Sequence, residues 1–536
     1  MQDYEKSVSF LGTWGSFQRR VFFLLCLTSI PSGYNILSPI FLMASPLHHC
    51  HIPTHSNLSQ DWIQASIPIQ LEMSSCSRYE LDLVQNLSAL GSNPEVFLSS
   101  LKQEDCKDGW TYSTEYYQST VVTEFNLVCR DQWKQPLSSS IYFLGGLCGC
   151  FISGQVSDRF GRKPVLFGSI TMLSIFSGAV AFAPSWPIFT VLFFMMGLCQ
   201  LSSYIVVFVL GSEILTGSTR VLFSSLGLPL SYVIGTMLLP GTTFLVRKWR
   251  HQSLIMAVPG LACLPFWLVP ESPRWLASCG RLQEAELVLR SAALENKVEP
   301  PQVIFIPAKN TEALSFLDLL RTKNMRYVTL ILWFFLSISL FGVVFNISSL
   351  YGNPFLNYFL VVAVEIPAHA VSWLMARSCP RRVSFISFTL LGVLSVLLIL
   401  TLDRTTGLTL FLVLLGKFGI QGGTAVSYVY TGELSPTVIR NTEMSTCAMF
   451  SRLGSSISPY LLQLGEAFFL PWIVVGSLSL LSVLLCVLLP ETFRKPLPDT
   501  IQQITLPQWS VCTVVLYCLL SVQYLWPCSN IVLELV

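Results

Sequence analysis

The sequence predicts an all-α membrane protein in which twelve helices form two related bundles of six. Three observations support this prediction. Of the 536 residues, 52% are hydrophobic and only 12% are charged, about half the charged fraction of a soluble domain. The apolar residues gather in runs of about 20, the length that crosses a bilayer. Charged motifs in the first half of the chain recur 220 residues later in the second half.

The composition also excludes several classes of protein. A mean hydropathy of +0.59 requires many spans, which excludes soluble enzymes, disordered scaffolds and single-pass receptors. Lys+Arg 32 against Asp+Glu 30 leaves a net charge of +2, which does not indicate a nucleic-acid partner. The chain lacks both the Gly-x-x-x-x-Gly-Lys-Ser/Thr phosphate loop and a Cys-x-x-Cys metal motif. We therefore expect no enzyme activity, no metal and no cofactor.

Charge-poor runs predict six spans, a charged linker and six further spans. The first six runs are residues 21–43, 138–157, 164–184, 187–211, 222–246 and 252–269. The last six are residues 327–348, 355–377, 383–402, 408–431, 441–464 and 470–489. The expected domains are an N-terminal segment 1–20, a bundle 21–269, a linker 270–326, a bundle 327–489 and a tail 490–536.

The basic residues predict that the linker and both termini face the cytosol, because cytosolic loops are enriched in Lys and Arg. If the spans alternate, most basic loop residues fall on one side, and Arg247, Lys248 and Arg250 are the exceptions. The tail carries an unexpected apolar segment, 509–528. We interpret this segment as a thirteenth crossing, an interfacial segment or an alternative splice end. A crossing would move the C-terminus to the other side.

The largest loop on the opposite side, residues 44–137, has the features of an extracellular domain. It contains two Asn-X-Ser glycosylation acceptors, Asn57 and Asn86. It also contains an even number of cysteines, which suits disulfides in an oxidising space. These cysteines are Cys50, Cys76, Cys106 and Cys129. Two disulfides are expected, and the spacing leaves their pairing open.

The duplication places acidic and basic residues at equivalent span ends. Glu433 follows Glu213 by 220 residues, and Arg440 follows Arg220 by the same interval. We interpret these charges as gating ion pairs that lock one half against the other, since such pairs can switch between two states. The alternative is that they only anchor the topology. The gating candidates are Asp158, Arg159, Arg162, Lys163, Glu213, Arg220, Glu271, Arg274, Glu433, Arg440 and Glu491.

Several motifs carry a resemblance to a known superfamily. The stretch Gly154-Gln-Val-Ser-Asp158-Arg159-Phe-Gly161-Arg162-Lys163 resembles the signature loop between the second and third helices of the major facilitator superfamily. The stretches Pro270-Glu-Ser-Pro-Arg-Trp275 and Gly432-Glu433-Leu-Ser-Pro-Thr-Val-Ile-Arg440 resemble its organic ion transporter family, solute carrier family 22. The motifs Asp108-Gly-Trp110 and Ser451-Arg452-Leu-Gly454-Ser are similar to the carnitine and zwitterion branch. The resemblance implies a major facilitator fold.

Charged residues inside spans are costly and usually functional. Three candidates for substrate binding are Arg452, Lys417 and Glu365. A guanidinium offers a bidentate fork to a carboxylate, and the resemblance implies Arg at the position of Arg452 in anion and zwitterion carriers. The alternative is that Arg452 forms a structural pair with Glu365 or Glu466. His369 lies one helical turn from Glu365, so their side chains can meet.

Aromatic side chains are candidates for holding a quaternary ammonium group, which prefers aromatic faces. The candidates are Tyr428, Tyr430, Trp333, Phe341 and Tyr204. Two residues apart on a helix, Tyr428 and Tyr430 cannot share a face, so at most one of them points inward.

The chain departs from the family pattern where the resemblance implies asparagines suited to sodium. It has Ser32 in the first span and Ser203 in the fourth. Serine hydroxyls are weaker ligands for hard cations than amide carbonyls. Sodium is therefore a candidate coupling ion that these substitutions disfavour.

Together these features predict a plasma-membrane secondary transporter of small organic ions that works by alternating access. The resemblance implies carnitine-like zwitterions and organic cations as substrates. The alternatives are an organic anion transporter or exchanger that uses Arg452 together with Lys417, and a degenerate paralogue that does not transport. Apart from the lipid bilayer, we expect no obligate partner.

Overall fold

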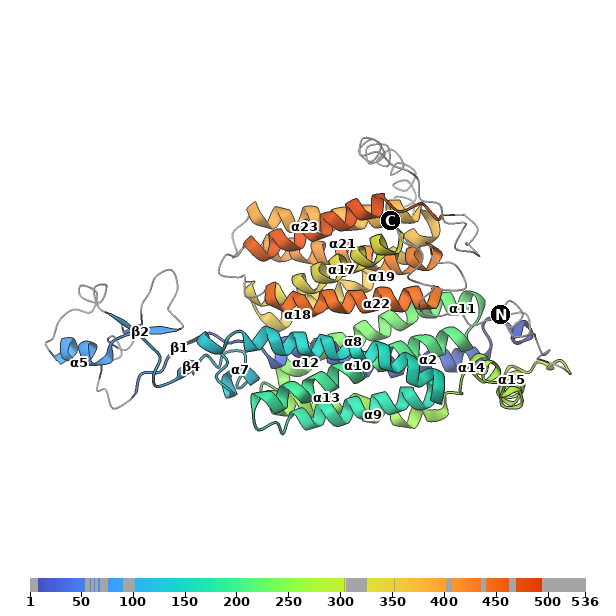
Figure 1. The fold of residues 1–536 in the computed structure, drawn as a ribbon, viewed down its shortest axis with the longest axis horizontal. Coiled ribbons are helices and arrows are strands. Elements are labelled where there is room, and N and C mark those ends of the chain that lie inside the picture. The colour runs from blue at the N-terminus through green and yellow to red at the C-terminus, as the bar shows by residue number, and fades with distance from the viewer. Residues whose placement is uncertain are drawn as a thin grey trace.

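The computed structural model describes most of the chain as two stacked groups of long helices with a separate loop domain at one end (Figure 1). The described residues are 8–53, 58, 62, 66–67, 76–89, 102–302, 304, 325–350, 352–401, 407–434, 440–461 and 469–493. Side chains of residues 325–327, 348–349, 440–442 and 445 are not among them. The predicted tail segment 509–528 and the acceptor Asn57 lie outside these residues.

The first half, blue to green in Figure 1, contains the helices of the first six expected spans. They are α2 (Ser16–Ile36) with α3 (Ser38–Leu42), α8 (Lys134–Phe160), α9 (Arg162–Val180), α10 (Trp186–Ile214), α11 (Gly217–Leu222) with η5 (Phe223–Gly227) and α12 (Leu228–Leu245), and α13 (Trp249–Ala262) with η6 (Leu264–Leu268). Glycines let these helices approach closely. A Cβ added at Gly145 of α8 or Gly197 of α10 would overlap the backbone of the other helix. The linker adds α14 (Pro273–Ser278) and α15 (Leu282–Asn296).

The second half, yellow to red, is built from the remaining helices (Figure 1). They are α17 (Met325–Phe345) with η7 (Asn346–Ser349), α18 (Pro354–Ala363) with α19 (Glu365–Ser378), α20 (Arg381–Leu398) with η8 (Ile399–Thr401), α21 (Gly407–Leu434), α22 (Arg440–Ile457) and α23 (Phe469–Val487). Among the described residues, 11 helices are long and apolar enough to cross a membrane. Helix α22 occupies the place of the expected eleventh span, but its charged residues keep it out of that group. The number of twelve spans therefore stays a prediction.

The loop between α3 and α8 folds as a small domain that projects from the bundle (Figure 1). Strand β1 (His48–Cys50) pairs antiparallel with β4 (Trp110–Tyr112), and β2 (Ser77–Tyr79) pairs with β3 (Gln103–Asp105). The domain also contains α5 (Leu81–Ala89), α7 (Val121–Glu124) and η4 (Cys129–Asp131). Its disulfides join Cys50 to Cys106 and Cys76 to Cys129, which settles the pairing that the spacing left open. Asn86 is exposed on α5.

One of the three basic residues that do not fit the predicted topology, Arg250, is held by a local ion pair. Arg250 donates to both carboxylate oxygens of Glu124 and to the backbone carbonyls of Ala181 and Ala183. The Trp249 indole donates to the same carboxylate at 2.6 Å. Because Glu124 neutralises the charge of Arg250, the position of Arg250 is only weak evidence against the topology that the basic residues predict.

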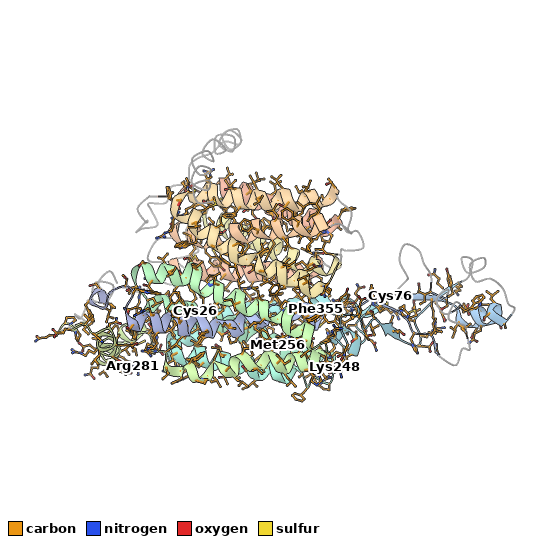
Figure 2. The ribbon with its side chains drawn as sticks, turned by 180° about the vertical axis from the view of Figure 1, so that it is seen from behind. Cys26, Cys76, Lys248, Met256, Arg281 and Phe355 are labelled. Carbon is orange, nitrogen blue, oxygen red and sulfur yellow. A yellow bond between two sulfur atoms is a disulfide. The ribbon has the colours of Figure 1, made fainter. Side chains whose placement is uncertain are left out.

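Among the described residues, the two halves share a hydrophobic core at one end of the bundle. We call the end that carries the loop domain the loop end, and the end that carries α14 and α15 the linker end. At the loop end, one cluster of buried residues includes side chains of both halves, and Phe355 lies where the halves meet (Figure 2). Three further clusters lie at the linker end, each built within a single half or on the linker. The halves are therefore closed against each other at the loop end.

Candidate functional site

Arg452 lies between the two halves, just inside the closed loop end. It is one helical turn before Ser456, whose carbonyl accepts a 2.5 Å hydrogen bond from the Ser140 hydroxyl of the first half. Its Nε atom is buried and has no hydrogen-bond partner. Among the described residues, no carboxylate lies within ion-pair distance of Arg452; Glu365 instead pairs with Lys417. Glu466, the other partner considered, lies outside the described part of the chain.

Four tyrosines from both halves lie within electrostatic reach of this guanidinium. Tyr142, Tyr204 and Tyr232 belong to the first half and Tyr428 to the second. The rings of Tyr204 and Tyr232 meet edge-to-face, with centroids 4.9 Å apart. A fixed cation with an unpaired donor and tyrosines within electrostatic reach can bind a carboxylate, and a nearby ammonium group can then lie against a ring.

Lys417 and Glu365 form a separate ion pair within the second half. Lys417 Nζ on α21 lies 2.8 Å from Glu365 Oε1 on α19, and the lysine side chain is only 2% exposed. Lys417 also donates to the side-chain Oε1 of Gln421 at 3.4 Å. The Gln421 amide nitrogen lies 3.2 Å from His369 Nε2. Lys417 is thus held by Glu365 and is not the free second cation that the organic anion alternative requires.

The aromatic candidates take different positions. Tyr428 is 44% exposed in the described structure, and its ring lies 4.5 Å from that of Trp333. Trp333 is itself buried and donates to the Thr431 hydroxyl, so its ring is fixed and packs against that of Tyr428. The prediction for Tyr430 is wrong, since this residue is 3% exposed and its hydroxyl donates to the Pro490 carbonyl at the linker end.

The last two aromatic candidates lie in different places, Phe341 at the closed loop end and Tyr204 near Arg452. Phe341 meets Phe143 of the first half edge-to-face with centroids 5.0 Å apart, so it belongs to the loop-end closure. Tyr204 faces Tyr232 beside Arg452. Of the five aromatic candidates, Tyr428 and Tyr204 are the two near the guanidinium.

Ser32 and Ser203 face each other, and their hydroxyl groups are hydrogen-bonded to one another. Their hydroxyl oxygens lie 2.5 Å apart, and both hydroxyls also contact the Gln200 backbone carbonyl. Hydroxyl groups that are already paired in this way offer few free lone pairs to a cation.

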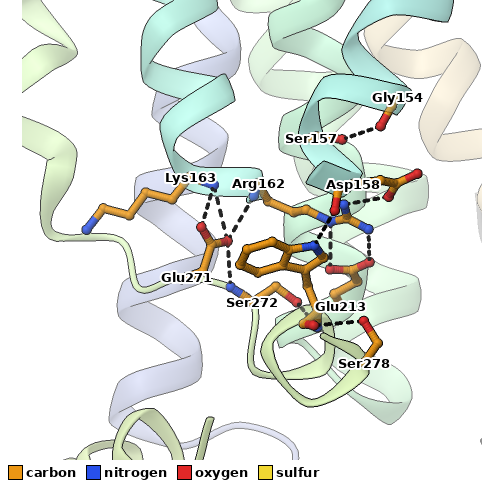
Figure 3. A network of polar contacts seen from close by, with 10 residues as sticks. Gly154, Ser157, Asp158, Arg162, Lys163, Glu213, Glu271, Ser272 and Ser278 are labelled. Carbon is orange, nitrogen blue, oxygen red and sulfur yellow. Dashed lines mark hydrogen bonds and ion pairs between the residues drawn. The ribbon is translucent and has the colours of Figure 1, made fainter. Parts of the chain in front are cut away.

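Charged residues at the linker end of the first half form one network (Figure 3). The Arg162 guanidinium donates to Glu213 at 3.1 and 3.3 Å and to Asp158 at 2.6 Å. The Glu271 carboxylate accepts from the backbone amides of Arg162 and Lys163 at the start of α9. A carboxylate at a helix N-terminus satisfies amides that have no partner within the helix.

The second half repeats this network with equivalent residues. Arg381 donates to Glu433, with a shortest contact of 2.8 Å. Glu491 accepts from the backbone amides of Arg381 and Arg382 at the start of α20. The sequence duplication therefore corresponds to a repeated set of contacts.

In this state the ion pairs of these networks lie within single halves, and the prediction that such pairs lock one half against the other stays a prediction. Among the described side chains, each of these pairs joins helices of a single half. The physical reason is that each carboxylate caps or contacts a neighbouring helix of its own bundle.

The remaining gating candidates lie at the same end. Arg159 and Lys163 contact the rings of Phe160 and Trp267, whereas Arg220 and Arg274 lie on α11 and α14. The side chain of Arg440 is outside the described residues.

Sequence reasoning missed Tyr232, although a signal was present. Tyr232 precedes Arg452 by 220 residues, the interval of the duplication, so it is the counterpart of Arg452 in the first half. Both side chains reach the same region between the halves. Applying the duplication interval to Arg452 would have identified this tyrosine.

Comparisons with known proteins give consistent results. The model of the sugar (and other) transporter family matches residues 97–502. Organic cation/carnitine transporter 2 of Homo sapiens is 45% identical over 524 residues, 94% of each chain. Solute carrier family 22 member 4 of Mus musculus is 42% identical and covers 94% of this chain and 95% of its own. An organic cation transporter protein of Drosophila melanogaster is 33% identical over 93% of this chain and 94% of its own.

Solved structures support the fold. The chain is similar to the inward open conformation of the xylose transporter XylE from E. coli, with a TM-score of 0.59 at 12% identity. The similarity covers 90% of this chain and 98% of the transporter. At this level of identity the comparison supports the major facilitator fold alone.

Proposed function

The chain belongs to solute carrier family 22, within the sugar (and other) transporter family, and from this premise we propose that it carries small organic ions across the plasma membrane by alternating access. It is a multi-pass membrane carrier and not an enzyme. The preferred substrates are zwitterions of the carnitine type, with organic cations as a second class. This extends to the present chain what the names of its relatives state about those proteins.

The observation that supports this proposal most directly is the state of Arg452. Its guanidinium lies between the halves, keeps a buried donor without a partner, and has no carboxylate within ion-pair distance in the described structure. A buried donor without a partner is costly, so a substrate carboxylate that pairs with it replaces a missing interaction. Tyr428, Tyr204 and Tyr232 then offer ring faces to the cationic group of the same substrate.

The arrangement of the halves supports alternating access. The halves share a core at the loop end and keep separate cores at the linker end. With the predicted topology, the separate cores lie on the cytosolic side. Two-state switching would require the loop-end contacts to separate and the linker ends to close.

We further propose that transport does not depend on sodium. The hydroxyls of Ser32 and Ser203 bond to each other and to the Gln200 carbonyl, so they present no open set of oxygen ligands. Replacing external sodium by N-methylglucamine is expected to leave uptake unchanged. A loss of uptake on this replacement would contradict the sodium-independent mechanism and leave the substrate assignment intact.

The test compares uptake of labelled L-carnitine and tetraethylammonium in oocytes that express the wild type or Arg452→Ala. Charge-assisted hydrogen bonds contribute about 1.5–3 kcal/mol each, so carnitine uptake should fall at least about tenfold. Tetraethylammonium has no carboxylate, and its uptake should fall less. Arg377→Ala is the matched control, because Arg377 is an exposed arginine stacked on Trp373 at the linker end. Equal losses of both substrates, at equal surface expression, would contradict the assigned role of Arg452.

A further inference from the structure

The buried ion pair of the second half has consequences for substrate charge. Lys417 is almost completely buried, and its ammonium contacts the Glu365 carboxylate at 2.8 Å. An unpaired charge at this depth would be very costly, so each member of the pair requires the other. The pair therefore contributes no net charge to its surroundings.

The pair and Arg452 border the same region between the halves. Helix α19, which begins at Glu365, packs against α12 of the first half, and α21, which carries Lys417, packs against α22, which carries Arg452. Glu365 also remains partly accessible, with 16% of its side chain exposed. A solute bound at Arg452 is therefore close to a carboxylate whose partner is a lysine.

The other polar groups around Glu365 do not change the net charge of the Glu365–Lys417 pair. Lys417 and Gln421 face it from α21, and His369 lies one turn along its own helix. His369 contacts the Gln421 amide and so forms part of the same hydrogen-bonded set. Of Lys417 and Arg452, only Arg452 is left without an acidic partner among the described residues.

We propose that Glu365 is the residue that restricts this carrier to solutes with a single carboxylate. This inference rests on the proposed function. Glu365 keeps Lys417 neutralised, so a second substrate carboxylate would find only the Glu365 carboxylate and an occupied lysine. Like charges at close range repel strongly in a medium of low dielectric constant. Zwitterions and monocarboxylates are therefore accepted, and dicarboxylates are excluded.

The variant that tests this inference is Glu365→Gln, which keeps the side-chain shape and releases Lys417. We expect it to gain saturable uptake of labelled succinate, about tenfold or more above the wild type, because a charge-assisted contact becomes available. The double variant Glu365→Gln with Lys417→Gln removes the released cation and should lose this gain. The charge-swapped variant Glu365→Lys with Lys417→Glu keeps the pair and should exclude succinate as the wild type does.

Lys417→Gln provides a mirror-image test if Glu365→Gln does not reach the surface. It leaves Glu365 without its lysine, so the ratio of tetraethylammonium to carnitine uptake should rise. The inference is overturned if Glu365→Gln reaches the surface, still transports carnitine and takes up no succinate. It is also overturned if the double variant takes up as much succinate as Glu365→Gln, or if the Lys417→Gln ratio does not change. Failure of the wild type to transport carnitine or tetraethylammonium would instead contradict the proposed function.

Discussion

Phe355 is expected to hold the loop end closed, so its truncation should shift the conformational equilibrium of the carrier. The side chain is 4% exposed and projects from α18 of the second half. Its ring neighbours all belong to the first half or to the loop domain. They are Phe41 at 6.2 Å, Tyr116 at 6.4 Å, Tyr117 at 5.2 Å and Phe244 at 5.9 Å between centroids.

The size of the effect follows from these contacts. Truncating a buried Phe to Ala costs about 3–5 kcal/mol, and each aromatic pair adds about 0.5–1.5 kcal/mol beyond the burial of area. Because the neighbours lie across the closure, this cost applies to the closed loop end and not to the opened one. A difference of about 3 kcal/mol corresponds to a shift of roughly 100-fold in the ratio of the two states.

The assay is thiol labelling of Ser140→Cys from the loop side. Ser140 is buried in the closure, where its hydroxyl contacts the Ser456 carbonyl. An impermeant maleimide should modify Cys at position 140 much faster when Phe355→Ala is also present, as read by mass spectrometry of that peptide. Phe385→Ala is the matched control, because Phe385 is equally buried in a cluster of the second half alone. An unchanged labelling rate, or an equal increase in the control, would refute the reasoning.

Two further predictions concern local networks. Burial raises the pKa of the Glu124 carboxyl, but hydrogen bonds from Arg250 and Trp249 outweigh this effect and hold the pKa below its ordinary value of 4.5. The stability that the Glu124–Arg250 pair contributes is therefore present above pH 4.5 and is lost as the pH falls below 4.5. The difference in Tm between the wild type and Glu124→Gln should therefore become smaller in acid. A Tm difference that stays constant from pH 7 to below 4.5 would contradict this. Gly161 has φ +104, and an added Cβ would lie 2.6 Å from Glu271 Oε2, so Gly161→Ala should lose about 1–3 kcal/mol and lower the Tm in detergent. In Gly154→Ala the added Cβ meets no atom within 4 Å, and this control should keep or raise the Tm; equal Tm values for both variants would show that the Glu271 cap is unimportant.

Hydropathy and the duplication were enough to predict the helical membrane fold. Runs of about 20 apolar residues must cross the bilayer as helices, because lipid cannot satisfy backbone hydrogen-bonding groups. The same reasoning identified Arg452, since a charge within a span is costly and stands out in the sequence. Helix α22 shows the limit of hydropathy, because its charged side chains give it the composition of a helix that is not a span.

Partner choice could not be predicted in the same way. From the sequence we considered an ion pair between Glu365 and Arg452, whereas in the structure Glu365 pairs with Lys417. The sequence predicted ion pairs between the halves, whereas Arg162 and Arg381 pair within their own halves. In each case several opposite charges were available, and their separation along the chain did not distinguish them.

The sequence by itself determined that the chain is a duplicated, multi-pass carrier with a fixed cation in its eleventh expected span. These properties depend on composition and on intervals along the chain, both of which can be read from the sequence without knowing how the helices pack. Only the tertiary structure decided which cysteines are joined, that Tyr428 and not Tyr430 lies near Arg452, and that Tyr232 lies within electrostatic reach of the same guanidinium. Such contacts depend on how neighbouring helices are rotated and packed, and a rotation of one residue, about 100°, moves a side chain from the central space to another face.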